Sequence, residues 1–312
     1  MYLKPSENLQ LLGMDKYFRE ITNLYIKKKM PNNILLSGKK GVGKSTLAYH
    51  IINYALSLNE DNKYDILNFK IDLKNRSFKL IQNNSHPNFY LVDLKEEKKI
   101  IDVLQIREMI NYTNKSSFDN MPRFILIDNI ENLNKNSVNA LLKIVEEPND
   151  GIFFILINNS EKKISSTLKS RCLNFKINLS FNESIEVANC LFNKNVLNSI
   201  NKDLINYYLT PGKIVNLVDL AEEKKINLLD YNLINLINLL IDKGYYKKNK
   251  LVKNMMLEFI ELFFLKLYRI SNKKKLIFNF YHNFLINIKN TEKFNLDEEM
   301  LFLEFKSKLL NG

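Results

Sequence analysis

The sequence contains little cysteine, glycine and histidine, no tryptophan and no long apolar run. Its 312 residues include only two cysteines, Cys172 and Cys190, and three histidines. No CxxC pair and no His/Cys cluster is present, so we expect no zinc site. No uncharged apolar run reaches about 18 residues, which argues against a membrane span. The N-terminus has no apolar signal-peptide core, and we therefore expect a cytoplasmic protein.

Arginine is also scarce, although the chain is basic. Lys+Arg 46 against Asp+Glu 34 gives a net charge of +12, but only six of the basic residues are arginines. An excess of lysine and asparagine is what an A+T-rich coding sequence produces, so the charge alone does not predict nucleic-acid binding. Apolar residues make up 46% and charged residues 26%, as in folded soluble proteins. The length predicts two or three domains.

Residues 1–178 alternate between short apolar runs and helical patterns. The runs predict five strands, and apolar residues at helical spacing predict helices between them. Strands that are apolar throughout indicate a parallel sheet covered by helices on both faces, which is an α/β fold. The predicted strands are 34–37, 89–92, 124–127, 153–157 and 173–177, and the predicted helices are 44–58, 103–113 and 137–146.

After residue 179 only helical patterns remain. We predict short helices at 182–192, 201–209 and 214–223, with the second ended by Thr210-Pro211-Gly212, and long helices at 228–241, 249–270, 274–288 and 298–310. The chain is therefore expected to comprise an α/β domain (1–178), a small helical domain (179–221) and an all-helical domain (222–312).

One motif points to nucleotide chemistry. Residues 38–45 match G-x-x-x-x-G-K-[ST] in full, between a predicted strand and a predicted helix. In such a loop the glycines let backbone N–H groups close around phosphate oxygens, while Lys44 reaches the outer phosphates and Ser45 can ligate Mg²⁺. A loop that keeps this shape without binding nucleotide is the alternative.

A second acidic position supports ATP binding more than hydrolysis. Asp128 follows a predicted strand and can hold the Mg²⁺. Many hydrolases of this class have glutamate at the next position to polarise the attacking water, but here that residue is Asn129. Glu131, two residues further on, is the candidate substitute.

Arg171 precedes the fifth predicted strand, within Ser170-Arg171-Cys172. A guanidinium is rigid and always charged, and it is the group that stabilises phosphate charge from a neighbouring subunit. The alternative is a surface arginine that caps a helix end.

These motifs carry a resemblance. The P-loop, the N-A-L-L-K-x-x-E-E-P stretch at 139–148 and the S-R-C at 170–172 resemble the AAA+ clamp-loader family of DNA replication, over about residues 12–177. The resemblance implies an AAA+ P-loop domain, a helical lid and a helical collar that holds a ring of subunits. It also implies partners: the motor and delta-like subunits of that ring and, through the complex, the sliding clamp and primed DNA. ATP with Mg²⁺ is the implied cofactor.

The resemblance also implies roles for individual residues. Arg171 falls on the arginine that acts in trans on a neighbour's ATP, Asn159 on the sensor of the terminal phosphate, and Lys213 near a second sensor. Ser45 and Asp128 fall on the Mg²⁺ site. The ATP-binding positions are Gly38, Gly41, Val42, Gly43, Lys44, Ser45, Thr46, Asn159 and Lys213.

The chain departs from the ATP-hydrolysing motor subunits at Asn129, and it lacks the four-cysteine module that many relatives carry. Both departures favour similarity to the delta-prime branch, whose role is that of a stator in clamp loading. The ATP-hydrolysing motor subunit of the same ring is the alternative, and a different P-loop ATPase of DNA processing is a third.

Overall fold

The computed structural model describes residues 4–95, 98–115, 121–160, 163–206, 209–247, 249–294 and 296–307. The chain forms two compact units. The first contains Met1–Cys190 and Thr210–Gly212, and the second contains Leu191–Leu209 and Lys213–Gly312. The predicted division of the helical part into a lid and a collar stays a prediction.

The first unit is built on a five-stranded parallel sheet in the order β2-β3-β4-β1-β5. Each predicted strand is confirmed to within one residue at either end. The strands are β1 (Asn33–Ser37), β2 (Phe89–Val92), β3 (Arg123–Ile127), β4 (Ile152–Asn158) and β5 (Leu173–Lys176). Because all five run in the same direction, their carboxyl ends share one edge of the sheet.

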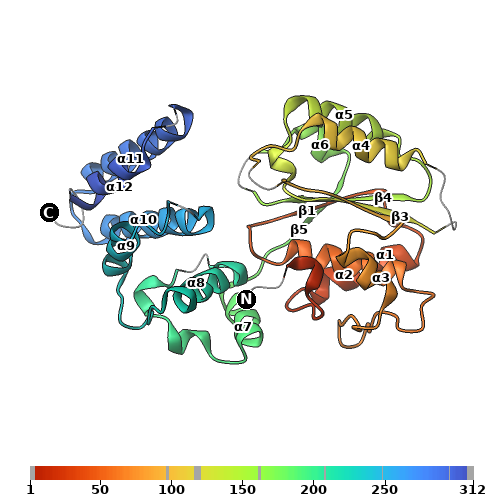
Figure 1. Cartoon of the computed structure of the whole chain (residues 1–312), viewed down its shortest axis with the longest axis horizontal. Helices are drawn as coiled ribbons and strands as arrows, with labels where there is room; N and C mark the ends of the chain where they lie inside the picture. Colours follow the sequence, from red (N-terminus) through yellow and green to blue (C-terminus); the bar gives the residue numbers. More distant parts are fainter. Residues whose placement is uncertain are drawn as a thin grey trace. The chain divides into compact units, whose positions relative to one another are not determined.

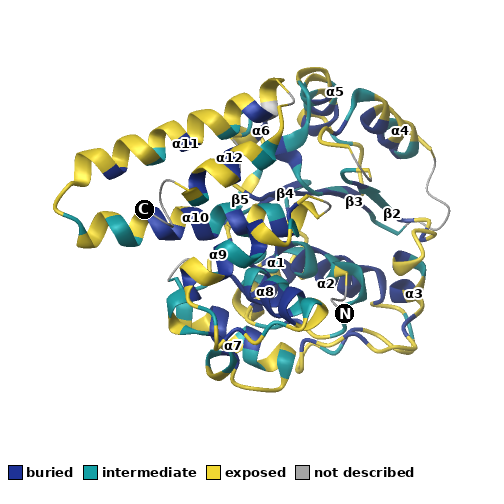
Figure 2. Cartoon of the chain, turned by 60° about the vertical axis from the view of Figure 1, so that its left-hand side comes forward, coloured by how far each residue is buried: buried dark blue, intermediate teal, exposed yellow. Residues whose placement is uncertain are grey.

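Helices cover both faces of this sheet (Figure 1). One face carries α1 (Asp15–Ile26), α2 (Lys44–Leu56) and α3 (Arg76–Gln82); the other carries α4 (Val103–Thr113), α5 (Lys135–Glu146) and α6 (Ser166–Ser170). Successive residues of β1 enter different cores: Ile34 and Leu36 pack with α1 and α2, whereas Leu35 packs with α4 and α5. This double burial explains why β1, β3 and β4 read as nearly unbroken apolar runs, and Figure 2 shows most of the sheet in the colour of buried residues; the edge strand β5 is more exposed. The sequence did not predict α1, α3 or α6.

The other helices follow in order. They are α7 (Phe181–Phe192), α8 (Pro211–Lys224), α9 (Leu233–Asp242), α10 (Lys250–Ile270), α11 (Lys274–Phe294) and α12 (Glu298–Phe305). Of these, α9 to α12 lie wholly in the second unit. None of the helices in the described ranges is both long and apolar enough to cross a membrane.

The predicted helix at 201–209 is wrong. The described part of this segment contains only the 3-10 turn η4 (Lys202–Leu204), and residues 207–208 lie outside the described residues. The Asp203 carboxylate accepts a hydrogen bond from the backbone N–H of Leu233 at 2.7 Å and pairs with Lys266. These bonds tie the segment to α9 and α10 instead of to a helix of its own.

Two helix starts differ from the prediction by three residues or more. Pro211 and Gly212 begin α8, because proline has no N–H to satisfy and fits the first helical turn. Helix α9 begins at Leu233, five residues later than predicted, because the Asn232 side chain caps it by accepting from the N–H of Asn235. The predicted end of the last helix, at 308–310, lies outside the described residues.

Candidate nucleotide-binding site and trans arginine

The P-loop connects the carboxyl end of β1 to the amino end of α2. Gly41 and Gly43 have φ angles of 81° and 100°, values that favour glycine. Gly38 is required for space, since a Cβ there would lie 2.2 Å from the Ile177 carbonyl oxygen. Val42 is buried and anchors the loop in the core on the α2 side. The loop therefore has the shape that exposes backbone N–H groups to a phosphate.

Lys44 is the first residue of α2, and only 3% of its surface is exposed. Its ammonium group donates hydrogen bonds to the carbonyls of Gly38 at 3.0 Å and Lys39 at 2.7 Å. The charge is thus held across the loop, beside the helix N-terminus where an anion is favoured. Thr46, in the same turn, accepts a hydrogen bond from the Asn8 side chain at 3.4 Å.

Segment Thr210–Gly212 lies against the outside of the loop. The Thr210 hydroxyl donates to the Lys40 carbonyl, and the Gly212 N–H donates to the Gly41 carbonyl, both at 2.9 Å. A Cβ on Gly212 would lie 2.8 Å from Gly41 Cα, so only glycine fits this approach. These contacts occupy loop carbonyls that would otherwise oppose an anion.

Two carboxylates lie at the strand ends beside the loop. Ser45 Oγ donates to Asp128 Oδ2 at 2.5 Å. Asp93 follows β2 directly, and the pairing of Val92 with Ile127 places it beside Asp128. Desolvation raises the pKa of both carboxyl groups, and in Asp128 the charge of Asp93 raises it further, while the Ser45 hydrogen bond lowers it. Excess negative charge of this kind suits a site for a cation.

Asn129 forms hydrogen bonds with both Asp93 and Asn159. Its Nδ2 donates to Asp93 Oδ1 at 2.7 Å, and its Oδ1 accepts from Asn159 Nδ2 at 2.8 Å. The Asn159 backbone N–H donates to Glu131 Oε2 at 3.2 Å, and Glu131 is buried. Glu131, which the sequence offered as a substitute base, here holds the backbone of Asn159.

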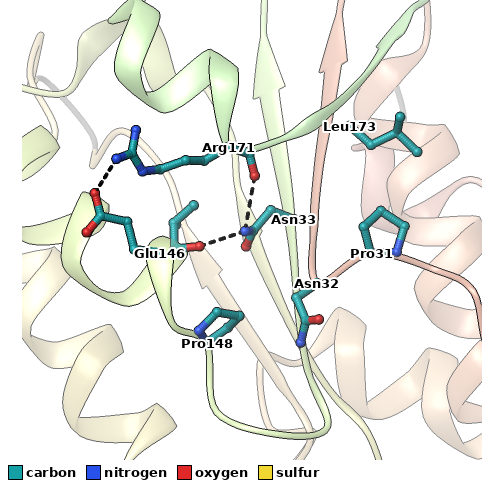
Figure 3. Close-up of a pocket in the computed structure, with 8 residues that line it drawn as sticks. Pro31, Asn32, Asn33, Glu146, Pro148, Arg171 and Leu173 are labelled. Carbon is teal, nitrogen blue, oxygen red and sulfur yellow. Dashed lines mark hydrogen bonds and ion pairs between the residues drawn. The ribbon is translucent and has the colours of Figure 1, made fainter.

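Arg171 lies at the opposite edge of the sheet. It caps the end of α6, and the pairing of Leu173 with Ile34 places it at the amino-terminal end of β1. Its guanidinium pairs with Glu146 at 2.6 Å (Figure 3). It also donates a hydrogen bond to the Thr167 carbonyl at 2.9 Å. A pocket of about 390 Å³ adjoins it, lined by Pro31, Asn32, Asn33, Val145, Glu146, Pro148, Arg171 and Leu173.

Asn33 ties this edge together. Its Nδ2 donates to the carbonyls of Val145 at 2.8 Å and Arg171 at 3.3 Å, which fixes the ends of α5 and α6 against β1 (Figure 3). The E-E-P end of the N-A-L-L-K-x-x-E-E-P stretch and the S-R-C stretch, far apart in the chain, therefore meet at one surface.

The structure brings Lys44, Ser45, Asp128 and Asn159 together at the carboxyl edge and places Arg171 at the other edge. Lys213 belongs to the second unit, where it pairs with Glu258 at 2.9 Å. Sequence reasoning missed Asp93. The signal was available, since Asp93 follows the strand at 89–92 in the same way that Asp128 follows the strand at 124–127.

The residues present fit a magnesium ion bound together with a nucleotide. The Ser45 hydroxyl and the Asp128 carboxylate are hard oxygen donors placed beside the phosphate loop, which is what Mg²⁺ prefers. In the described ranges no cluster of three or more His, Cys, Asp or Glu side chains forms a metal site.

Fold and loop together define the class: an α/β protein with a complete P-loop at the carboxyl edge of a parallel sheet. Within that class, residues 13–180 match the protein-family model described as DNA polymerase III, delta subunit. The match covers more than half of the chain, and the chain belongs to this family.

Its relatives carry the names of two different subunits. DNA polymerase III subunit gamma of Buchnera aphidicola subsp. Schizaphis graminum is 34% identical over 183 residues, which are 58% of this chain and 48% of the relative. Subunit delta' of the same organism is 31% identical over 185 residues, 59% of this chain and 54% of the relative. Subunit delta' of Pseudomonas aeruginosa is 28% identical and covers 45% of this chain and 40% of the relative. The chain spans about half the length of these relatives.

Solved structures resemble the chain more loosely. A gamma-subunit-related protein of Thermotoga maritima gives a TM-score of 0.41 at 13% identity, with 83% of this chain and 76% of that chain covered. The clamp loader delta protein of Bacillus subtilis gives 0.33 at 13% identity, with 93% and 83% covered. The family assignment depends on the sequence match and not on these structures.

Proposed function

We propose that the chain is a delta-prime-like subunit of a DNA polymerase III clamp loader, which acts as a stator in ATP-dependent loading of the sliding clamp onto primed DNA. Its partners are the motor and delta-like subunits. The observation that carries this proposal is the position of Arg171, at the sheet edge opposite the chain's own P-loop.

The separation of the two edges explains why Arg171 serves a neighbour. Strand β1 runs from Asn33, beside Arg171, to Ser37, beside the P-loop. A five-residue strand spans on the order of 15 Å, which is longer than an arginine side chain. The guanidinium therefore cannot act on a nucleotide bound by Lys44 of the same chain. It is fixed by Glu146 and Thr167, remains partly exposed, and is available to a phosphate from outside.

The chain's own nucleotide site supports binding more than hydrolysis. Lys44, Ser45 and Asp128 form the phosphate and magnesium side, with Mg²⁺ neutralising phosphate charge when the nucleotide is bound. The position for a general base is occupied by Asn129, whose amide accepts no proton at neutral pH and already bonds Asp93 and Asn159. We infer that ATP with Mg²⁺ binds here and is turned over slowly or not at all.

The second unit offers a surface for assembly. Helices α10 to α12 leave large apolar side chains exposed, and Figure 2 shows most of α11 in the colour of exposed residues. Patches of this kind mark protein interfaces. In these helices and the connection between α11 and α12, the large apolar side chains exposed by 45% or more are Leu251, Ile270, Leu276, Phe278, Phe294, Leu296, Met300 and Leu303. We infer that this surface packs against the corresponding helices of the other subunits.

Reconstitution with and without the chain tests the proposal. Clamp-loader subunits and the clamp of the same organism are purified, and loading of labelled clamp onto primed circular DNA is measured. A stator predicts that loading requires the chain, that the isolated chain hydrolyses no ATP, and that a complex carrying Lys44→Ala still loads. Steady-state hydrolysis by the isolated chain, abolished by Lys44→Ala, would instead establish the motor subunit. Loading that is indifferent to the chain would refute both roles.

A further inference from the structure

The corner between β2, β3 and β4 contains a directed chain of side-chain hydrogen bonds. Asp93 Oδ1 accepts from Asn129 Nδ2 at 2.7 Å, and Asn129 Oδ1 accepts from Asn159 Nδ2 at 2.8 Å. The three residues follow the ends of three adjacent strands. Asp93 is not among the residues proposed to hold the phosphates or Mg²⁺, which are Lys44, Ser45 and Asp128.

The direction of this chain is set at Asp93. Its Oδ1 also accepts the backbone N–H of Leu94 at 2.6 Å, so this oxygen acts as an acceptor toward Asn129 as well. The amide group that Asn129 turns toward Asp93 must therefore be NH₂. Its oxygen then faces Asn159 and can only accept, so Asn159 must also turn its NH₂ toward Asn129. The acceptor oxygen of Asp93 thus orients two amides that could otherwise rotate by half a turn.

The orientation matters because Asn159 falls on the terminal-phosphate sensor. Phosphate oxygens only accept hydrogen bonds, so a sensing amide must present N–H. One N–H of Asn159 Nδ2 is used by Asn129, which fixes the amide plane and leaves the second N–H of that group for a ligand. Glu131 fixes the backbone of the same residue from the other side, through Oε2 and the Asn159 N–H.

We propose that Asp93 is a positioning residue for phosphate sensing: through Asn129 it fixes the amide of Asn159 so that the chain distinguishes ATP from ADP. The inference rests on the proposed nucleotide site. It does not require hydrolysis, and Asp93 is not itself placed in contact with the nucleotide.

The test compares the affinities of the full chain for ATP and ADP, each with Mg²⁺, by calorimetry. Asp93→Asn keeps the size of the side chain but can donate to Asn129, so the two amides lose their fixed direction. We expect its ADP affinity and its thermal midpoint to match the unaltered chain, while the preference for ATP falls by about five- to tenfold, the size of one oriented hydrogen bond. Asn159→Ala should lose the same preference. Asp150→Asn, which removes an exposed carboxylate at the other sheet edge, should change neither affinity.

A double variant separates positioning from a general structural effect. Asn129→Ala removes the middle member of the Asp93–Asn129–Asn159 hydrogen-bond series. Asp93→Asn combined with Asn129→Ala should therefore lose no more ATP preference than either change alone. If the losses of ATP preference in the two single variants add up in the double variant, Asp93 does not act through Asn129, and the proposal is overturned. An unchanged or increased ATP preference in Asp93→Asn, while Asn159→Ala loses it, would overturn it too. If the unaltered chain binds neither nucleotide, the nucleotide site and the proposed role of Asp93 both fail; if it binds both equally, only the sensing claim fails.

Discussion

His50 lies inside α2, fully buried, with a hydrogen-bond partner on each ring nitrogen. Nε2 faces the Asn8 carbonyl at 3.0 Å, which only accepts, so Nε2 carries the hydrogen. Nδ1 then accepts from the Tyr64 hydroxyl at 2.9 Å. Burial lowers the pKa of His50 to about 4, with the Asn8 bond opposing the shift. The neutral ring thus joins the segment before α1 to the helix that carries the P-loop.

The pH dependence of stability follows from this histidine. Between pH 6.5 and about 4 the unfolded chain takes up a proton that the folded chain refuses, so the free energy of unfolding falls as pH falls through this window. The contribution is about 3 kcal/mol and is fully present above pH 6.5. Urea unfolding at pH 7, 5.5 and 4.5 should show His50→Gln less stable than the unaltered chain at pH 7, with the difference shrinking toward pH 4.5. A difference constant with pH would contradict the assignment.

A substitution at Ser45 should distinguish the binding of Mg²⁺ from the binding of the nucleotide itself. Its hydroxyl bonds Asp128 and faces the phosphate loop. We expect Ser45→Ala to remove most of the increase in ATP affinity that Mg²⁺ gives, about tenfold or more, and to leave ATP affinity in EDTA within about twofold. Titrations with Mg²⁺ and with EDTA measure both quantities. Ser57→Ala, at the other end of α2, is the matched control and should keep the full Mg²⁺ effect.

The P-loop lies directly against the residue that follows β5. Gly38 follows β1, and Ile177 follows β5; the Ile177 N–H donates to the Ser37 carbonyl at 2.7 Å. A side chain at residue 38 would lie within 2.2 Å of the Ile177 carbonyl oxygen, and neither backbone is free to move. The shape of the P-loop thus depends on the pairing of two strands whose residues are far apart in sequence.

Two glycine substitutions distinguish this steric cost from backbone strain. Gly38→Ala should lower the free energy of unfolding by about 3 kcal/mol or more, because the loop must leave its place on β5. Gly151→Ala meets no neighbouring atom but has φ of +73°, so it should cost only about 1 kcal/mol. Denaturant unfolding of both variants gives the comparison. Equal losses would show that the contact with Ile177 is not the constraint.

Strands β1 to β4 could be predicted from the sequence because they consist almost wholly of apolar residues, as burial of a central strand requires. The P-loop, Asp128 and Arg171 could be predicted because their spacing and context repeat a motif. Helix α1 was missed although its signal was available, since Phe18, Ile21 and Tyr25 recur at helical spacing on its buried side. The turn at η4 could not be predicted, because Asp203 bonds residues distant in sequence. The bridge from Asp93 through Asn129 to Asn159 depends on the register of three strands. The Glu146–Arg171 pair depends on how α5 and α6 end at β1.

The whole molecule carries its two predicted functions at opposite edges of one sheet, a P-loop at the carboxyl edge and an arginine at the amino edge. Under the proposed function, Arg171 serves the nucleotide site of a neighbouring subunit and not the P-loop of its own chain. In a ring, each subunit can receive an arginine from one neighbour and give one to the other. We propose that the exposed apolar side chains of α10 to α12 form the contact surface of that ring.

Assembly should depend on that apolar surface. Phe278, in α11, is 58% exposed and stacks only on His282 among the described ring contacts. We expect Phe278→Glu to keep the fold of the isolated chain, with a thermal midpoint within a few degrees, and to weaken incorporation into the complex by tenfold or more. Size-exclusion chromatography of the mixed subunits measures incorporation. Leu67→Glu, an equally drastic change at a residue that is 85% exposed in the first unit, should assemble normally. Normal assembly of Phe278→Glu would place the interface elsewhere.

ATP hydrolysis by the reconstituted complex tests whether Arg171 acts on the nucleotide of a neighbouring subunit. Arg171→Ala removes the guanidinium but leaves the P-loop and α10 to α12 unchanged; Lys169→Ala removes an exposed charge from the same short helix. A trans arginine raises kcat by about 10³ or more at the one nucleotide site that it completes. The whole complex should lose less, because its other nucleotide sites keep their own arginines. If Arg171 acts in trans, both complexes should assemble fully, Lys169→Ala should hydrolyse ATP at the normal rate, and Arg171→Ala should lose DNA-stimulated hydrolysis severalfold. A fully assembled Arg171→Ala complex with unchanged hydrolysis would contradict it.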